Sequence, residues 1–326
     1  MIKNKLKLGV AAVSIAGLLL NAPSASAATF PAKGKTITII VPYDAGGGGD
    51  IGARMLAPYF KAAIGATNVE IVNKPGAGSQ VGISALAAAA PDGYTIGFTH
   101  LPATITTYLD PTRAATYNLS KLTPLSMMVV VPTMLVVRGE SKYTSLKDLL
   151  ADAAAGSKVT ISDSGILSDG HLATLQLQQQ SGAKLQAVHS TGGAATTADV
   201  LGGQVSAGTL NVGGATNELV KSGKLRIIAM FSKTKDKTFP TAKTAKEQGY
   251  PIYCSTSRAI SGPAGMSNTV VNKISTALRS AMANPEFMAK ANAAGLYIQF
   301  MWPNQLQAYW LDMQTATIPL MALKNS

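Results

Sequence analysis

A run of glycines is the part of the sequence best suited to binding an anion. It follows a β-rich stretch at residues 36–41 and precedes a helix-like stretch at residues 51–63. Glycines at such a turn let backbone N–H groups approach a ligand, and the positive end of the following helix favours negative charge. A phosphate or a carboxylate would fit this requirement. The residues expected to contact a ligand here are Tyr43, Asp44, Ala45, Gly46, Gly47, Gly48 and Asp50.

The same loop also matches the dinucleotide-binding pattern G-x-G-x-x-G through Gly47, Gly49 and Gly52, and Glu70 follows near the distance expected of a ribose-binding carboxylate. However, a run of glycines matches this pattern by chance. The pattern also begins several residues after the strand, and Glu70 lies inside a predicted strand rather than at its end. A carboxylate is therefore the favoured ligand, with dinucleotide binding as the alternative, and no cofactor is expected.

Two further loops of small residues follow predicted strands and precede predicted helices, at residues 162–170 and 190–194. Ligands of open α/β sheets bind beyond the carboxyl ends of the strands, which is where all three loops lie. The three loops are better explained as parts of one ligand crevice than as three unrelated turns. The residues expected to contribute from the second and third loops are Ser164, Gly165, Ser168, Thr191, Gly192, Gly193 and Ala194.

Ser164, Asp169 and His171 raise a second alternative, an exported hydrolase. They are close in sequence, whereas the members of a catalytic triad usually come from separate segments, and no G-x-S-x-G turn surrounds the serine. No pair of carboxylates suits glycosidase chemistry. We therefore expect a binding protein rather than an enzyme.

The remaining reactive residue types give little support to other chemistry. Cys254 is the single cysteine, so it is interpreted as a core residue. The histidines, His100, His171 and His189, are scattered and do not suggest a zinc site. His100 follows a strand, but we interpret it as a structural residue with satisfied hydrogen bonds.

Composition and the N-terminus place the chain outside the cytoplasm. Residues 1–27 combine a lysine-rich start, a short apolar run and small residues at Ala25 and Ala27, which is typical of a secretory signal peptide cleaved after Ala27. The net charge is +12, but charged residues make up only 13% of the chain and form no dense cluster with aromatics, so no nucleic-acid partner is expected. No later apolar stretch reaches membrane-spanning length.

Strand-like and helix-like stretches alternate along the chain, which predicts α/β architecture with parallel sheets. Two interdomain crossings are expected near residues 129–137 and 225–231. The predicted strands are residues 36–41, 69–72, 94–98, 132–137, 158–162, 185–189, 205–210, 225–231 and 252–260. The predicted helices are residues 51–63, 79–90 (opened by Ser79), 145–155 (capped by Ser145), 170–180, 194–201, 268–283 and 303–318.

Several motifs, taken in order, resemble signatures of the Bug/TctC family of solute receptors, which serve tripartite tricarboxylate transporters. The resemblance covers nearly all of the chain after the signal peptide. The motifs are VPYDAGGGGDIGAR at 41–54, NKPGAG at 73–78, APDGYT at 90–95, LGGQV at 201–205, KSGKLR at 221–226 and GPAG at 262–265.

The resemblance implies a type II periplasmic-binding-protein fold, with two α/β lobes, a ligand cleft and two crossing strands. We expect lobe 1 to comprise residues 28–130 and 226–326, and lobe 2 residues 131–225. The implied ligand is a di- or tricarboxylate or an aromatic carboxylate, and the implied partners are membrane permease subunits. The protein is expected to act in the periplasm as a monomer.

Three further residues bear on the ligand. Asp44 stands where the family commonly has proline or another uncharged residue, so it is either a solvated loop residue or a selector for a ligand carrying an amine or hydroxyl donor. Arg258 is the candidate for binding a second anionic end of the ligand, because guanidinium pairs with carboxylate through two hydrogen bonds; an interlobe or surface salt bridge is the alternative. Asn211 comes directly after a predicted strand and is expected to lie in the same cleft, where it could hydrogen-bond to the ligand.

Overall fold

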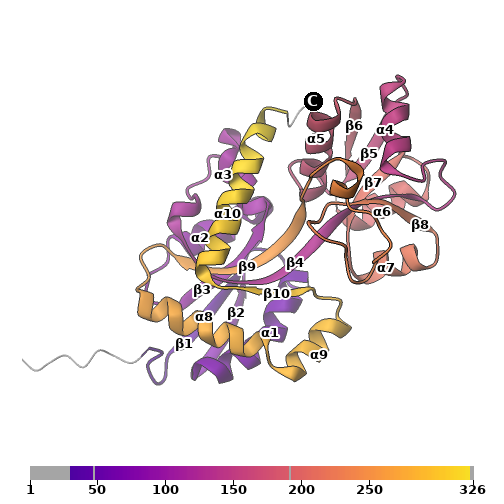
Figure 1. Cartoon of the computed structure of the whole chain (residues 1–326). Coiled ribbons are helices and arrows are strands. Elements are labelled where there is room, and N and C mark those ends of the chain that lie inside the picture. The colour runs from indigo at the N-terminus through magenta and orange to yellow at the C-terminus, as the bar shows by residue number, and fades with distance from the viewer. Residues whose placement is uncertain (1–29, 47, 191, 324–326) are drawn as a thin grey trace, which may run out of the picture. The chain divides into compact units, whose positions relative to one another are not determined.

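The computed structural model describes residues 30–46, 48–190 and 192–323, so the predicted signal peptide lies outside the described residues. The chain divides into two units, Met1–Phe30 and Pro31–Ser326, and the fold described here is that of the second (Figure 1). Its strands are β1 (Thr36–Val41), β2 (Asn68–Asn73), β3 (Thr95–Leu101), β4 (Leu122–Arg138), β5 (Val159–Asp163), β6 (Leu185–His189), β7 (Ala207–Asn211), β8 (Leu225–Met230), β9 (Ser255–Pro263) and β10 (Ile298–Met301). Its α-helices are α1 (Gly48–Ile64), α2 (Gln80–Ala87), α3 (Ala103–Leu109), α4 (Leu146–Ala154), α5 (Asp169–Ser181), α6 (Gly193–Leu201), α7 (Gly214–Lys221), α8 (Asn268–Met282), α9 (Pro285–Ala293) and α10 (Pro303–Thr317).

The strands form two groups that share β4. Their order is β2-β1-β3-β9-β4-β7-β5-β6, and β8 and β10 also pair with β4. In the first lobe β1 is parallel to β2 and β3, and in the second β5 is parallel to β6 and β7. Parallel pairing puts the carboxyl ends of each group at one edge, where the three predicted loops begin.

The strand β4 runs from one lobe into the other. Its first part, from Leu122 to Pro132, pairs with β9, and its last part pairs with β7 and β8. It is buried along almost its whole length, which is why its sequence is a nearly continuous apolar run without alternation. The first crossing was therefore predicted correctly.

The second crossing lies elsewhere than expected. The stretch predicted to cross, residues 225–231, forms β8 and pairs antiparallel with residues Met134–Arg138 of β4. The chain returns instead just before β9, where Cys254 N–H donates to Phe231 O and Thr133 N–H donates to Cys254 O. A buried apolar strand at a sheet edge and a crossing strand have the same hydrophobic pattern, so pattern alone did not separate them.

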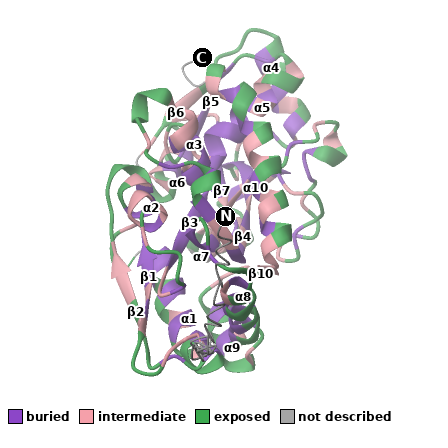
Figure 2. Ribbon diagram, turned by 90° about the vertical axis from the view of Figure 1, so that its left-hand side faces the viewer, coloured by how far each residue is buried: buried purple, intermediate pink, exposed green. Residues whose placement is uncertain are grey.

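Each lobe has its own hydrophobic core (Figure 2). The core of the first lobe includes Met127, Leu306 and Trp310, and that of the second includes Leu135 and Leu320. The last helix α10 thus packs on the first lobe, whereas the 3-10 segment that follows it, Ile318–Leu323, packs into the second. The C-terminus is a third link between the lobes.

Of the two helix starts predicted from a serine, one has the expected capping hydrogen bond and the other does not. Ser145 caps α4 in a capping box with Asp148, as expected. Ser79, predicted to open the second helix, precedes α2 but makes no capping hydrogen bond. Among the described residues, no helix is long and apolar enough to cross a membrane.

Candidate ligand-binding site

The first loop, residues 43–50, is held from inside by Asp50. This carboxylate is only 3% exposed; one oxygen accepts from Gly46 N–H at 2.9 Å and Arg54 Nε at 2.9 Å, and the other from Asn73 Nδ2 at 3.0 Å. Asn73 Nδ2 also donates to Tyr43 O at 3.0 Å. Chiefly through Arg54, these donors lower the pKa of Asp50 to about 2. The hydrogen bonds of the Asp50 carboxylate are thus made within the protein. Asp50 holds the backbone of the first loop in place and does not face outward.

The rest of the loop is open. Asp44, Ala45 and Gly46 are exposed, and Gly46 has the left-handed φ of +82° that favours glycine. No described residue forms a hydrogen bond or ion pair with Asp44. Gly47 lies outside the described residues, and Gly48 begins α1.

The helix α1 begins directly against the end of β3. A Cβ on Gly49 would lie 2.8 Å from His100 Nε2, so only glycine fits this contact without a shift. The ring of Tyr43 packs edge-on against His100, with ring centroids 4.5 Å apart. The glycine run therefore serves helix packing as well as exposing backbone N–H groups.

Arg258 lies in this same group of residues. It is opposite His100 in the pairing of β3 with β9. It is partly buried, and no Asp or Glu among the described residues forms an ion pair with it. Burial lowers the pKa of its guanidinium, and burial together with the charge of Arg258 lowers the pKa of His100 to about 3. His100 is thus neutral, and Arg258 is a partly buried cation that pairs with no carboxylate among the described residues.

The second and third loops meet in the other lobe. Asp163, fully buried at the end of β5, accepts from Gly165 N–H at 2.8 Å and lies 3.0 Å from His189 Nδ1. Burial raises the pKa of Asp163. Ser190 Oγ donates to Asp163 O at 2.7 Å. The two loops are therefore fixed to each other through Asp163 and Ser190.

Within these loops the predicted contact residues have different surroundings. Ser164 is exposed, whereas Ser168 caps α5 by accepting from His171 N–H at 3.2 Å. Gly193 and Ala194 are exposed at the start of α6, and Gly192 before them has a φ of +141°. Thr191 lies outside the described residues.

Asn211 joins this region through Asp169, the first residue of α5. Asn211 Nδ2 donates to Asp169 Oδ2 at 2.7 Å, and the Thr133 hydroxyl donates to the same oxygen. His171 Nδ1 instead accepts from Leu167 N–H at 3.0 Å. With Asp169 and His171 bound to separate partners, these residues do not form a catalytic triad with Ser164.

Residues 52–317 match the model of the TctC family, described as the "Tripartite tricarboxylate transporter family receptor". Protein BugT of Bordetella pertussis is 30% identical over 308 residues, which cover 94% of this chain and 93% of BugT. The chain belongs to the TctC family of solute receptors. Members and structural neighbours are binding proteins, not enzymes, which agrees with the expectation from sequence.

Solved structures place this TctC receptor in the same fold class. A TctC solute-binding protein from Polaromonas, with no ligand, superposes with a TM-score of 0.82 at 22% identity over 90% of this chain and 99% of that one. MatC from Rhodopseudomonas palustris, with bound malate, gives 0.71 at 22% identity over 90% and 100%. The predicted fold class is thereby confirmed.

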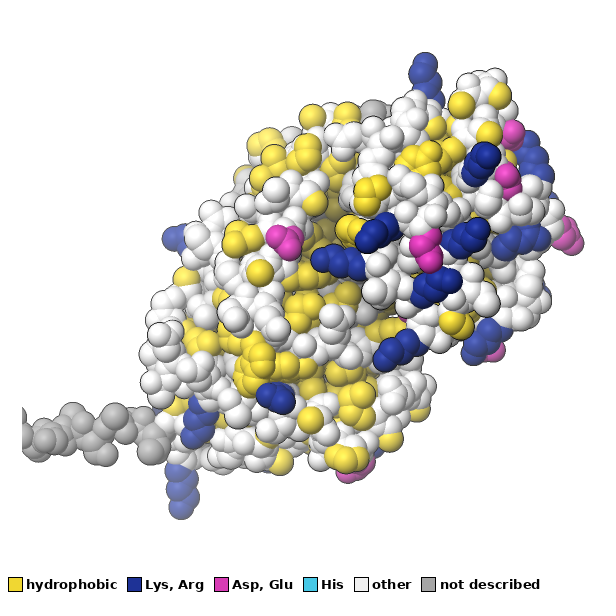
Figure 3. All heavy atoms as spheres, in the orientation of Figure 1, with side chains coloured by type: hydrophobic (Ala, Val, Ile, Leu, Met, Phe, Trp, Pro, Cys, Tyr) yellow, Lys and Arg dark blue, Asp and Glu magenta, His cyan; other side chains and the backbone are white. Residues whose placement is uncertain are grey.

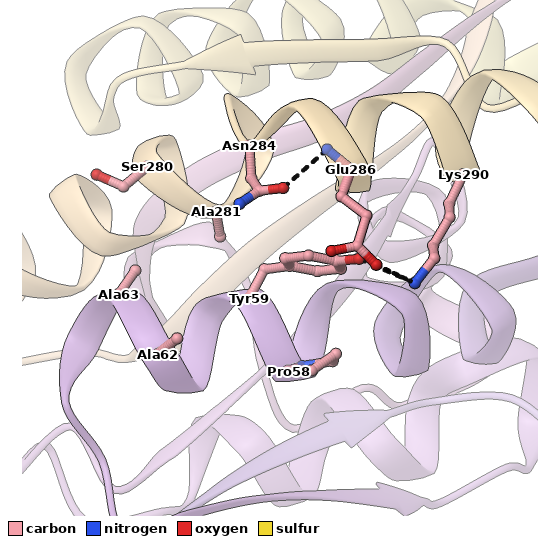
Figure 4. A pocket seen from close by; sticks show the side chains of 9 residues that line it. All are labelled: Pro58, Tyr59, Ala62, Ala63, Ser280, Ala281, Asn284, Glu286 and Lys290. Atoms are coloured by element: carbon pink, nitrogen blue, oxygen red, sulfur yellow. Dashed lines mark hydrogen bonds and ion pairs between the residues drawn. The ribbon is translucent and has the colours of Figure 1, made fainter.

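Two grooves on the described surface lie away from the predicted residues. One groove of about 550 Å³ runs between α1, α8 and α9, where Tyr59 and Glu286 flank Lys290 (Figure 4). Another of about 370 Å³ lies beside β8. No group of three or more metal-binding side chains occurs among the described residues. On the face in Figure 3, most Lys and Arg side chains gather toward the upper right, with Asp and Glu side chains among them.

Proposed function

We propose that this TctC receptor binds a small organic acid with two carboxylates between its lobes. The single observation that carries the proposal is Arg258, a partly buried cation beside the first glycine loop that has no anionic partner in the described part of the chain. A desolvated guanidinium is costly unless a carboxylate pairs with it. The malate bound to MatC, a receptor of similar fold, supports the same class of ligand.

The proposed site combines residues from both lobes. Exposed loop N–H groups would hold one carboxylate, and Arg258 the other. In this proposal Asp50 positions the backbone of the first loop and does not contact the ligand. The residues are Tyr43, Asp44, Ala45, Gly46, Gly47, Gly48 and Arg258 from the first lobe, and Ser164, Gly165, Ser168, Thr191, Gly192, Gly193, Ala194 and Asn211 from the second.

Two carboxylates bear on the rest of the ligand. Asp44 is exposed at the tip of the first loop, and the donors to Asp169 among the described residues are the neutral groups of Thr133 and Asn211. Both would repel an acid lacking a hydrogen-bond donor near them. We infer that a ligand with a hydroxyl or amine beside its carboxylate, such as malate or aspartate, binds more tightly than succinate.

The lobes would close on this ligand by bending at the crossings. The pairing of β8 with the last part of β4 supports assigning residues 132–254 to the second lobe, a longer stretch than residues 131–225 expected from sequence. The bend would then fall near Pro132 and Ser255, which face each other on β4 and β9.

We further propose that the receptor acts in the periplasm and delivers its ligand to permease subunits of a tripartite tricarboxylate transporter. The family description supports this partnership, and the N-terminal pattern supports export. Intact mass measurement of the exported protein should give a chain that begins at Ala28. A mature protein retaining residues 1–27 would contradict the export proposal.

A thermal-shift screen tests the ligand class. Malonate, succinate, malate, aspartate, glutarate, adipate and benzoate would each be added, since a ligand that binds only the folded state raises the melting temperature. Isothermal titration should then show one site per chain, and NMR should recover the acid unchanged. The proposal fails if no acid shifts the melting temperature, and the receptor assignment fails if product forms.

The role of Arg258 has a separate test. Arg258→Ala should weaken binding of a diacid more than tenfold and of the matching monoacid by less than threefold, because only the diacid has a second carboxylate to lose. Lys273→Ala, an exposed charge change on α8, is the control. Equal losses for both acids would refute the assignment.

A further inference from the structure

Ser79 has an unusual backbone conformation for its residue type. It lies in the loop between β2 and α2 with a φ of +85° and a ψ of −12°, which is the left-handed region. Gly76 and Gly78 in the same loop also have positive φ, as glycine readily does. A serine there carries a steric cost that glycine would not, so its side chain needs a reason to be present.

The usual reasons for a serine at a helix start are missing. Ser79 occupies the N-cap position of α2 but makes no capping hydrogen bond. Its hydroxyl is buried, with the residue 1% exposed, and apart from its interaction with the Tyr43 hydroxyl it has no hydrogen-bond partner among the described residues. Buried hydroxyls in folded proteins are nearly always satisfied by protein, water or ligand. Helix capping therefore does not explain this side chain, and the Tyr43 interaction leaves part of its hydrogen-bonding capacity unused.

The surroundings of Ser79 contain other polar groups without partners. Its hydroxyl lies beside that of Tyr43, where it opposes the rise in the pKa of Tyr43 caused by burial. Tyr43 packs against His100, whose Nδ1 is also buried without a hydrogen-bond partner. His100 in turn lies opposite Arg258 on the neighbouring strand. One unpaired cation and two unsatisfied polar atoms thus gather behind the first loop.

This combination suits an anion better than a neutral molecule. Arg258 supplies positive charge, the Ser79 hydroxyl supplies a donor, and the neutral His100 ring supplies another when its proton is on Nδ1. Hydrogen bonds from such groups to a carboxylate are stronger than those to an uncharged acceptor. The nearest carboxylate in the loop, Asp50, is already bonded to Gly46, Arg54 and Asn73 and does not serve them.

We propose that Ser79 is a specificity-determining residue whose hydroxyl, together with His100 and Arg258, receives one carboxylate of the bound acid, and that the left-handed conformation is retained for the sake of this hydroxyl. The inference rests on the proposed function and adds another loop of the first lobe, residues 74–80, to the site.

Three variants separate the hydroxyl from the backbone strain. Ser79→Gly removes both, and Ser79→Ala removes only the hydroxyl. Ala77→Gly, the matched control, relieves strain at an exposed residue of the same loop, where φ is +47°, and leaves the hydroxyl in place. Melting temperature without ligand would be measured, together with the Kd for whichever acid among malonate, succinate, malate, aspartate, glutarate and adipate binds the wild-type protein most tightly.

The expected result is a separation of stability from binding. Ser79→Gly and Ala77→Gly should both raise the melting temperature. Ser79→Gly and Ser79→Ala should weaken binding roughly tenfold or more, as for a lost hydrogen bond to a charged group, whereas Ala77→Gly should leave Kd within threefold.

Other outcomes overturn the inference in distinguishable ways. If the wild-type protein binds an acid and both Ser79 variants bind it equally well, the inference alone fails. If Ser79→Ala lowers the melting temperature with Kd unchanged, the hydroxyl holds an internal water and has no ligand role. If no acid of the panel binds the wild-type protein, the proposed function fails, and this inference falls with it.

Discussion

Replacing Asp50 with Asn should loosen the first loop in a way that depends on pH. Asn keeps the size of the side chain but substitutes an NH₂ group for one carboxylate oxygen. One oxygen of Asp50 accepts from Gly46 and Arg54 and the other from Asn73, so either placement of the NH₂ group sets it against a donor. One donor would meet another, and the favourable charge interaction with Arg54 would be lost. Both effects act on the loop that we propose binds the ligand.

The magnitude follows from the pKa of Asp50. A fall from 3.8 to about 2 corresponds to about 2 kcal/mol of stability for the ionised form. Arg54 is 53% exposed, and solvent screening reduces this to about 1–2 kcal/mol. Because folding lowers this pKa, the stabilisation is complete above the unfolded-state value of 3.8 and is lost as the pH falls toward 2.

Urea denaturation of the wild-type protein and Asp50→Asn at a series of pH values measures this. The wild-type protein should be more stable by about 1–2 kcal/mol at pH 7, and the difference should shrink between pH 4 and pH 2. Asp312→Asn, which removes an exposed charge on α10, should show almost no difference at any pH. A difference that stays constant from pH 7 to pH 2 would refute the role given to the Asp50 charge.

Two other changes test the packing of the site. Gly49→Ala should destabilise the protein by about 1–3 kcal/mol in thermal unfolding, because its Cβ would lie 2.8 Å from His100 Nε2. Gly193→Ala is the control: its Cβ would meet open space, so this variant should be neutral or slightly stabilising. Equal effects of the two changes would contradict the contact between Gly49 and His100. Asn211→Leu should cost about 1–3 kcal/mol by removing a donor from the buried Asp169 carboxylate, and a variant as stable as the wild-type protein in urea would show that water replaces the amide.

Local pattern predicted most of the elements, but α3, α7, α9 and β10 were missed. The strands β1 and β6 have the predicted bounds, since short apolar runs bounded by turns specify them. The helix α3 was missed because threonines dominate it, and β4 begins earlier than predicted because Pro124 interrupts its apolar run. The return crossing depends on long-range pairing that periodicity does not encode.

The site shows the same division between local and long-range information. Glycine and serine loops after strands were recognisable because turn chemistry is local. The partners of Asp50 were not, because Asn73 lies 23 residues away and the contact depends on how β1 and β2 align. His100 was expected to be satisfied, yet its Nδ1 has no partner among the described residues. The missing hydrogen bond of His100 can be recognised only from the structure, because it depends on how the ring packs between Gly49 and Arg258.

The late position of β9 has a consequence for the order of folding. Thr99 Oγ1 donates to Ala259 O across 160 residues of chain, so the sheet of the first lobe is incomplete until residues 255–263 are available. The strands β5, β6 and β7, by contrast, pair with one another within residues 159–211. The long sequence separation of β3 and β9 slows folding because loop closure precedes the stabilising contacts. We expect amides of β5 and β7 to gain hydrogen-exchange protection before those of β3 during refolding.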